Sequence, residues 1–215
     1  MDGITVTMAI VDFIPVVMFF AAAIILQRAL YNKMVKGAFA LLASGSILVL
    51  AGGAYKALWK ILYALSICDY PLLNNSFFPM QGLGFVLVFL SLAGMFTRFN
   101  KTGTGLSFAA IPVFDSSMPF VVFQVLGCAG TQVMLFIMAL KMKKAVAAVL
   151  FVIAFVAMLG MGYLSAKFDD TSSMHWIAQC VNIISNGALL AGVVVLDKAG
   201  LGYQDVFVKK AAANA

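Results

Sequence analysis

Residues 119–166 read "PFVVFQVLGCAGTQVMLFIMALKMKKAVAAVLFVIAFVAMLGMGYLSA", two long apolar runs that meet at three lysines in four residues. Each run, 119–141 and 145–166, holds the roughly 20 apolar residues that a helix needs to cross ~30 Å of hydrocarbon. The connection "KMKK" is so short that the two helices must form an antiparallel hairpin. The stretch therefore predicts a pair of neighbouring transmembrane helices.

Four further segments have the same character: 8–30, 37–55 (continuing as a helix to 67), 79–97 and 175–197. Hydrophobic residues make up 64% of the chain and charged residues 10%, and the mean hydropathy is +1.06. A soluble domain of 215 residues could not bury so much apolar surface. We predict an all-α, polytopic transmembrane helix bundle forming a single domain over 1–215, in a plasma or cytoplasmic membrane.

The number of crossings depends on residues 103–114, whose apolar part from Gly105 to Phe114 is short and interrupted by Pro112. A ten-residue helix reaches only ~15 Å, so this segment is either a short or broken fourth helix or a re-entrant element. The first choice gives seven crossings and the second gives six.

Lysine and arginine concentrate in cytoplasmic loops, which favours seven crossings with the N-terminus outside and the C-terminus inside. Eleven of the 14 basic residues then lie on the inner side, against six for six crossings from the same start and eight from the opposite start. These eleven are Arg28, Lys33, Lys36, Arg98, Lys101, Lys141, Lys143, Lys144, Lys198, Lys209 and Lys210.

A polar stripe follows the last apolar segment, in "SMHWIAQCVNIISN" (173–186). His175, Gln179, Asn182 and Asn186 fall within about 60° of one another on a helical wheel. Polar side chains facing lipid are costly, so this stripe should face the bundle interior. There it either binds a ligand or forms hydrogen bonds between helices, and His175 next to Trp176 also suits the membrane interface.

A second polar set can meet this stripe, because Gln124 and Thr131 share a face of the 119–141 helix, next to Gln132. Gln81 begins the 79–97 helix, level with Gln124 in the outer half of the bundle. Amides both donate and accept hydrogen bonds. We therefore predict a ligand pocket open to the outside, lined by His175, Gln179, Asn182, Asn186, Gln124 and Gln81.

Charged residues within the membrane provide a third feature. Asp12, followed by Pro15, lies inside the first segment, and a carboxylate there favours a cationic partner. Lys56 and Lys60 are one helical turn apart at the outer end of the second segment. They either extend to the lipid head groups or one of them pairs with Asp12 and gates the cavity.

Catalytic and cofactor sites are not predicted. Ser172 or Ser173 beside His175 would share a helix end with no fixed acid, and a haem ligated by His175 lacks an identifiable second ligand. Cys68, Cys128 and Cys180 have no metal-ligand spacing. Lys198 ends the last segment, so no lysine lies at mid-depth for a retinal Schiff base.

Three hypotheses follow for function. The leading one is a membrane protein that binds a small polar or amphipathic molecule within the bundle, for transport or for receptor-like sensing. The alternative is a non-catalytic subunit that docks on another membrane protein or on a second copy, and the third is a membrane enzyme or redox protein. The net charge of +6 suits anionic lipid head groups, and nucleic acid is not an expected partner.

Overall fold

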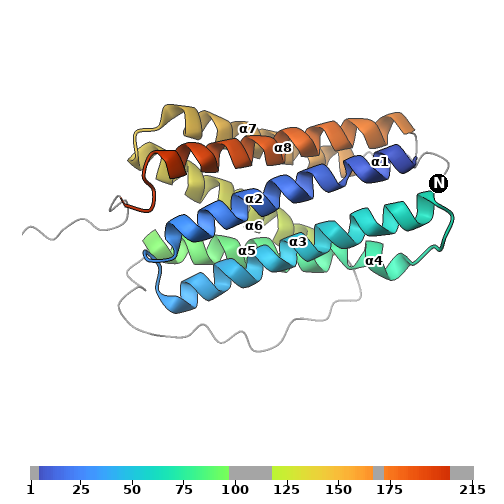
Figure 1. Ribbon diagram of the computed structural model, residues 1–215, viewed down its shortest axis with the longest axis horizontal. Helices are drawn as coiled ribbons and strands as arrows, with labels where there is room; N and C mark the ends of the chain where they lie inside the picture. The colour runs from blue at the N-terminus through green and yellow to red at the C-terminus, as the bar shows by residue number, and fades with distance from the viewer. Residues whose placement is uncertain (1–4, 97–117, 167–171, 204–215) are drawn as a thin grey trace, which may run out of the picture.

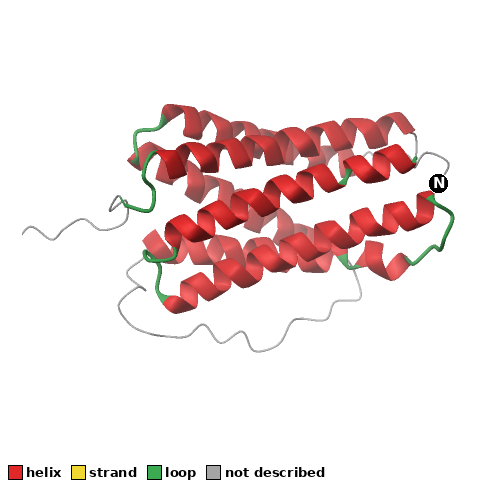
Figure 2. Ribbon diagram, in the orientation of Figure 1, coloured by secondary structure: helices red, strands yellow, loops and turns green. Residues whose placement is uncertain are grey.

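The computed structural model describes residues 5–96, 118–166 and 172–203, and every regular element in these ranges is a helix (Figures 1 and 2). The helices are α1 (Val6–Val11), α2 (Phe13–Leu30), α3 (Lys36–Ala64), α4 (Pro71–Asn75), α5 (Phe77–Phe96), α6 (Met118–Lys141), α7 (Ala145–Ala166) and α8 (Ser172–Lys198). The all-helical bundle expected from the sequence is confirmed. The segment 103–114 lies outside the described residues.

Five stretches are long and apolar enough to cross a membrane. They are Val6–Leu30, Lys36–Ala64, Pro71–Phe96, Met118–Lys141 and Ser173–Lys198, and α7 adds a shorter apolar stretch, Ala145–Met161. Large apolar side chains such as Val17, Ile47, Leu126, Val156 and Ile184 are exposed on the outer faces of these helices. An apolar exterior matches the acyl chains of lipid, so the chain is an integral membrane protein.

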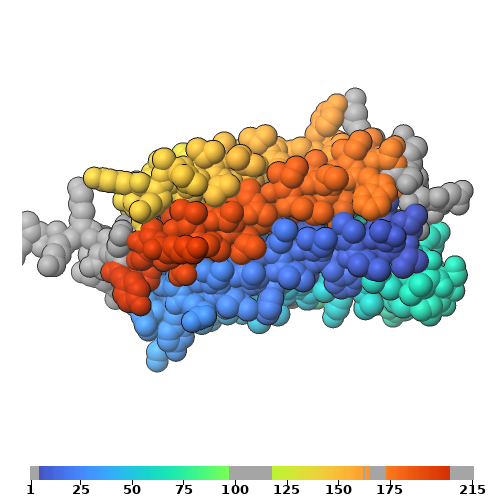
Figure 3. Space-filling model, turned by 45° about the horizontal axis from the view of Figure 1, so that its top comes forward, coloured from blue at the N-terminus to red at the C-terminus, as the bar shows by residue number. Residues whose placement is uncertain are grey.

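The long helices form a ring. Contacts join α2 to α3, α3 to α5, α5 to α6, α6 to α7 and α7 to α8, and α8 closes the ring against α2. Figure 3 shows the closing contact, with α8 lying along α1 and α2 across the length of the molecule. A ring of helices leaves an interior whose content depends on the side chains that point into it.

Helices α5 and α6 run parallel (Figure 1). A Cβ on Gly82 would lie 2.5 Å from the carbonyl oxygen of Phe120, and one on Gly127 would lie 2.5 Å from the backbone nitrogen of Val86. Residue numbers therefore increase in the same direction along the two helices. The helices approach so closely that only glycine fits at these positions. The end of α5 and the start of α6 consequently lie at opposite ends of the bundle.

The first apolar segment is interrupted, whereas the sequence predicted one continuous helix over 8–30. Helix α1 ends at Val11 and α2 begins at Phe13, with Asp12 between them. Pro15 has no N–H to donate to the carbonyl of Val11, and its ring crowds that carbonyl, which breaks the helix here. The short helix α4 was likewise not predicted.

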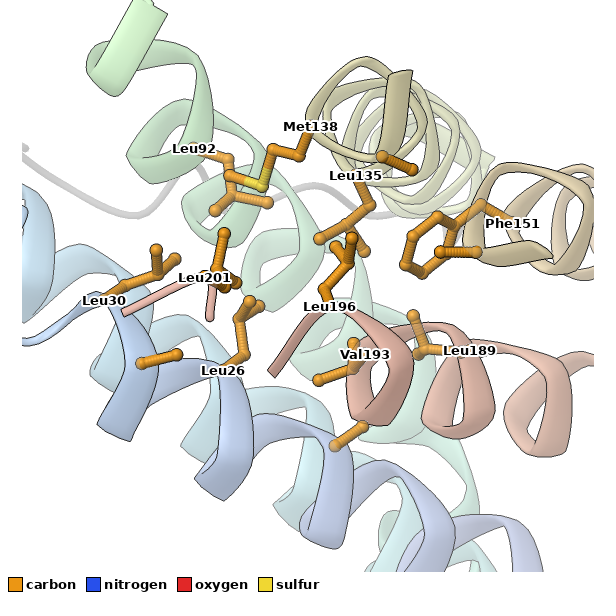
Figure 4. Packing of buried hydrophobic residues seen from close by; sticks show 14 of the residues in the cluster. Leu26, Leu30, Leu92, Leu135, Met138, Phe151, Leu189, Val193, Leu196 and Leu201 are labelled. Carbon is orange, nitrogen blue, oxygen red and sulfur yellow. The ribbon is translucent and has the colours of Figure 1, made fainter. Parts of the chain in front are cut away.

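One half of the ring interior is filled by a buried apolar cluster (Figure 4). Leu92, Leu135, Phe151, Val193 and Leu196 meet there from four helices, and each is at most 1% exposed. Seven of the nine described lysines and arginines lie toward this end: Arg28, Lys33, Lys36, Lys141, Lys143, Lys144 and Lys198. The opposite half of the interior is hollow.

Candidate functional site

A cavity of about 460 Å³ lies between the helices in the half away from the basic end. On the long helices the lining residues and the buried apolar residues follow one another and share only the boundary residues Phe19, Val49 and Leu189; on α8 the lining runs from His175 to Leu189 and the core from Ala188 to Leu196. The volume falls within the usual ~300–1,000 Å³ for small-molecule sites. The cavity is thus closed toward the basic end by packed apolar side chains.

All nine residues singled out from the sequence line this cavity. They are His175, Gln179, Asn182, Asn186, Gln124, Gln81, Asp12, Lys56 and Lys60. Helical periodicity predicts which of them share a face of one helix, and the ring brings those faces together. Thr131 is different, because its hydroxyl donates to the carbonyl of Gly127 at 2.8 Å in its own helix.

Helix α8 supplies the polar stripe. Gln179 is only 4% exposed, whereas its neighbour Cys180, about 100° further round the helix, is exposed. The Nδ2 of Asn186 donates to the backbone oxygen and to Oδ1 of Asn182, at 3.0 and 2.9 Å. These bonds lie within one helix, so the pair does not join α8 to a neighbour. A hydrogen bond from α8 to α7 comes instead from Ser185, whose hydroxyl donates to the carbonyl of Ala154 at 3.1 Å.

A chain of amides crosses from α6 to α3. The Nε2 of Gln124 donates to Oε1 of Gln81 at 2.9 Å, and the Nε2 of Gln81 donates to the carbonyl of Val49 at 3.5 Å. These two bonds engage both the nitrogen and the oxygen of the Gln81 amide, whereas Oε1 of Gln124 takes part in neither. It also fixes the height at which three helices meet around the cavity.

Three buried amide atoms in the wall have no hydrogen-bond partner among the described residues: Oε1 of Gln124, Oε1 of Gln132 and Nε2 of Gln179. An unsatisfied buried polar group costs about 1–3 kcal/mol, and native structures contain few of them. Three in one cavity wall leave two acceptors and one donor available to an occupant. Gln132, which was noted in the sequence but not assigned to the site, belongs to this group.

Charged side chains lie toward the end of the cavity that is farther from the apolar cluster. Asp12 forms an ion pair with Lys60, and the two side chains are 10% and 12% exposed. The Lys56 ammonium lies 4.1 Å from the centroid of the Phe77 ring. Of the two lysines considered as partners for Asp12, Lys60 makes the contact, while gating by this pair stays a prediction.

Aromatic residues complete the wall, and most of them could not be singled out from the sequence. Phe19, Phe77, Phe78 and Phe85 line the cavity together with Trp59. The indole Nε1 of Trp59 donates to Oδ1 of Asp69 at 3.0 Å, which ties α3 to the loop before α4. Apolar helices contain many aromatic side chains, and only the assembled ring of helices shows which of these side chains face the cavity.

In the described ranges, His, Cys and Asp side chains do not gather in groups of three that could hold a metal ion. The cavity wall therefore offers amides, charges and rings rather than a metal-ligand set in this part of the chain.

The fold and the cavity define an integral membrane helix bundle with a polar interior in one half. Compared with models of known protein families, with curated proteins and with solved structures, the chain matches none.

Proposed function

We propose that this protein binds a small polar or amphipathic molecule in the cavity of its helix ring, in order to carry it across the membrane or to sense it. The observation that carries the proposal is the set of three unpartnered amide atoms of Gln124, Gln132 and Gln179. A hydrogen-bonding ligand would satisfy them, and their burial would otherwise only destabilise the bundle.

The direction of the polar stripe supports ligand binding over docking of a partner protein. A docking subunit would present its polar stripe outward, to the partner. Here Gln179 and Asn182 line the interior cavity, and the exterior at Cys180 and Ile184 is apolar.

The proposal includes seven crossings, with the N-terminus outside and the basic end in the cytoplasm. Parallel α5 and α6 support it, because six crossings with a re-entrant element would make these helices antiparallel. Seven of nine described basic residues at one end support the orientation, since lysine and arginine are retained on the cytoplasmic side. On this orientation the cavity faces outward and the apolar cluster closes its inner side.

Substitution of Gln179 by leucine tests the function. If the amide serves a ligand, Gln179→Leu leaves the melting temperature of the free protein unchanged or higher, because an unsatisfied buried group has been removed. The same variant loses the stabilisation that a binding compound gives the wild type in a thermal-shift screen of polar metabolites. Cys180→Leu, one position further on the lipid side, is the matched control.

Two results would argue against the proposal. One is a metabolite screen in which no compound stabilises the wild type. The other is a Gln179→Leu variant that melts well below Cys180→Leu, since this would assign the amide to the stability of the bundle.

A further inference from the structure

The charges in the cavity wall do not balance. Three ionisable side chains line it, the acid Asp12 and the bases Lys56 and Lys60. The carboxylate of Asp12 is held by Lys60. The ammonium of Lys56 has a ring as its contact, the face of Phe77 at 4.1 Å, and no carboxylate partner among the described residues.

A ring is a weak substitute for a counter-ion. A lysine over an aromatic face gains about 0.5–2 kcal/mol, whereas removal of an ammonium from water costs several times more unless an opposite charge compensates it. Lys56 is half-buried on α3, with its ammonium against Phe77 at the start of α5. The wall therefore carries one positive charge in excess at a position that faces the cavity.

The other residues of the cavity wall indicate which further groups a suitable ligand must have. Rings of Phe19, Phe77 and Phe85 contribute apolar surface to the same cavity as Lys56. The acceptors left on Gln124 and Gln132 call for a hydrogen-bond donor on the ligand.

From this arrangement we infer that the ligand is a small organic anion, whose acid group binds Lys56 and whose body is apolar with at least one hydrogen-bond donor. The inference rests on the proposed function and names the chemical class that the same cavity takes. The acid group replaces the counter-charge that Lys56 lacks, so binding removes an electrostatic cost as well as adding a contact.

The test uses the full chain in phosphatidylcholine nanodiscs and three probe series, built on a phenol, an indole and a six-carbon alkyl chain. Each series contains a carboxylate, an amine and an alcohol of matched size. Isothermal titration calorimetry measures binding, because the phenol and indole probes absorb and fluoresce in the same range as tryptophan and would mask the emission of Trp59 in the cavity wall. We expect saturable binding of carboxylates, with the matched amines and alcohols at least tenfold weaker.

Variants of Lys56 make the assignment specific. Lys56→Gln should weaken carboxylate binding by about tenfold to a hundredfold, Lys56→Arg should retain most of it, and Lys36→Gln, at the exposed far end of the same helix, should not change it. The free Lys56→Gln protein should melt at the same temperature as wild type or above it. A lower melting temperature would make Lys56 a structural residue and overturn the inference.

Other results distinguish this inference from the proposed function. Binding of amines or alcohols as tightly as carboxylates, or carboxylate binding that is indifferent to Lys56→Gln, overturns the anion class while the cavity remains a binding site. Failure of all nine probes at millimolar concentration also overturns the anion class, and the metabolite screen above then decides separately whether the cavity binds anything.

An acid group can come from solution or from a lipid head group. Repeating the titrations in nanodiscs that contain phosphatidylglycerol separates these sources. Unchanged carboxylate affinity supports a soluble anion. Affinity that falls for wild type and not for Lys56→Gln supports the same lysine binding a lipid phosphate.

Discussion

At the scale of single residues, the polar side chains of the cavity divide by the contacts they make. Gln81 is hydrogen-bonded at both ends of its amide, to Gln124 and to Val49, and Asn186 is bonded back to Asn182. Asp12 and Lys60 are neutralised by each other. These residues give the wall its shape, while Lys56, Gln132 and Gln179 retain the capacity to bind something else.

The ion pair of Asp12 and Lys60 can be tested by removing one charge and then both. Asp12→Asn leaves the ammonium of Lys60 uncompensated, and loss of one partner from a largely buried pair costs about 3–5 kcal/mol. We expect a clear fall in the unfolding midpoint of the detergent-solubilised protein. Asp12→Asn/Lys60→Gln should recover most of it, and a double variant as unstable as the single one would contradict the pairing.

At the scale of helices, close backbone packing holds one side of the ring together. Gly45 of α3 packs against Gly84 of α5. Gly82 of α5 packs against the backbone of α6, and Gly127 of α6 packs against the backbone of α5. Helices in a bilayer gain little from hydrophobic burial against one another, so van der Waals contact between small residues stabilises their association. The amide chain from Gln124 to Val49 crosses the same two helix contacts.

Two glycines of α5 provide a matched comparison. In Gly82→Ala the new Cβ would lie 2.5 Å from the carbonyl oxygen of Phe120, so α5 and α6 must separate. Overpacking of this kind costs about 1–3 kcal/mol. At Gly94 no atom of the described residues lies within 4 Å of the added atom, and alanine is the better helix former. We expect Gly82→Ala to melt lower than wild type and Gly94→Ala to melt no lower, and equal melting temperatures would contradict the parallel contact.

The helices themselves were largely accessible from the sequence, because hydrocarbon thickness fixes the length of an apolar segment. The expected ranges 119–141 and 145–166 differ by at most one residue at either end from α6 and α7. The break at Asp12 was not predicted, since hydropathy is averaged over a window and Pro15 acts on one carbonyl. Helix α4 has five residues, too few for a periodic signal.

At the scale of the whole molecule, the ring separates a polar half from an apolar half. Helical periodicity could assign Gln179 and Asn182 to one face, but it carries no information about which faces of other helices lie opposite. For that reason the sequence suggested the polar residues of the site, whereas its rings, Phe77 and Phe85, emerged only from the packing. The sequence left both Lys56 and Lys60 open as partners of Asp12. The charge of Lys56 is in excess because Lys60 forms that ion pair.

Labelling from one side of the membrane tests the proposed seven crossings. Native Cys68 is exposed in the loop before α4, and Cys128→Ser/Cys180→Ser leaves it as the single thiol. Met118→Cys then marks the start of α6 and Lys143→Cys the turn before α7. We expect an impermeant maleimide to label Cys68 and Met118→Cys in intact cells, and Lys143→Cys only after permeabilisation.

In the six-crossing alternative, α6 begins on the cytoplasmic side. Protection of Met118→Cys in intact cells, with Cys68 still labelled, would therefore exclude the proposed seven crossings. Each variant contains both Cys68 and one introduced cysteine, so the two sites are compared within the same preparation.

The apolar cluster also has an electrical consequence. On the proposed orientation, a cavity filled from the outer medium carries the external potential down to Leu189, so the transmembrane voltage falls mainly over the nine residues from there to Lys198, about 14 Å of helix. An anion could reach Lys56 almost without crossing the field, and its occupancy there would hardly depend on voltage. Any passage through the cluster would cross nearly the whole field, at about 2.3 kcal/mol per charge for every 100 mV.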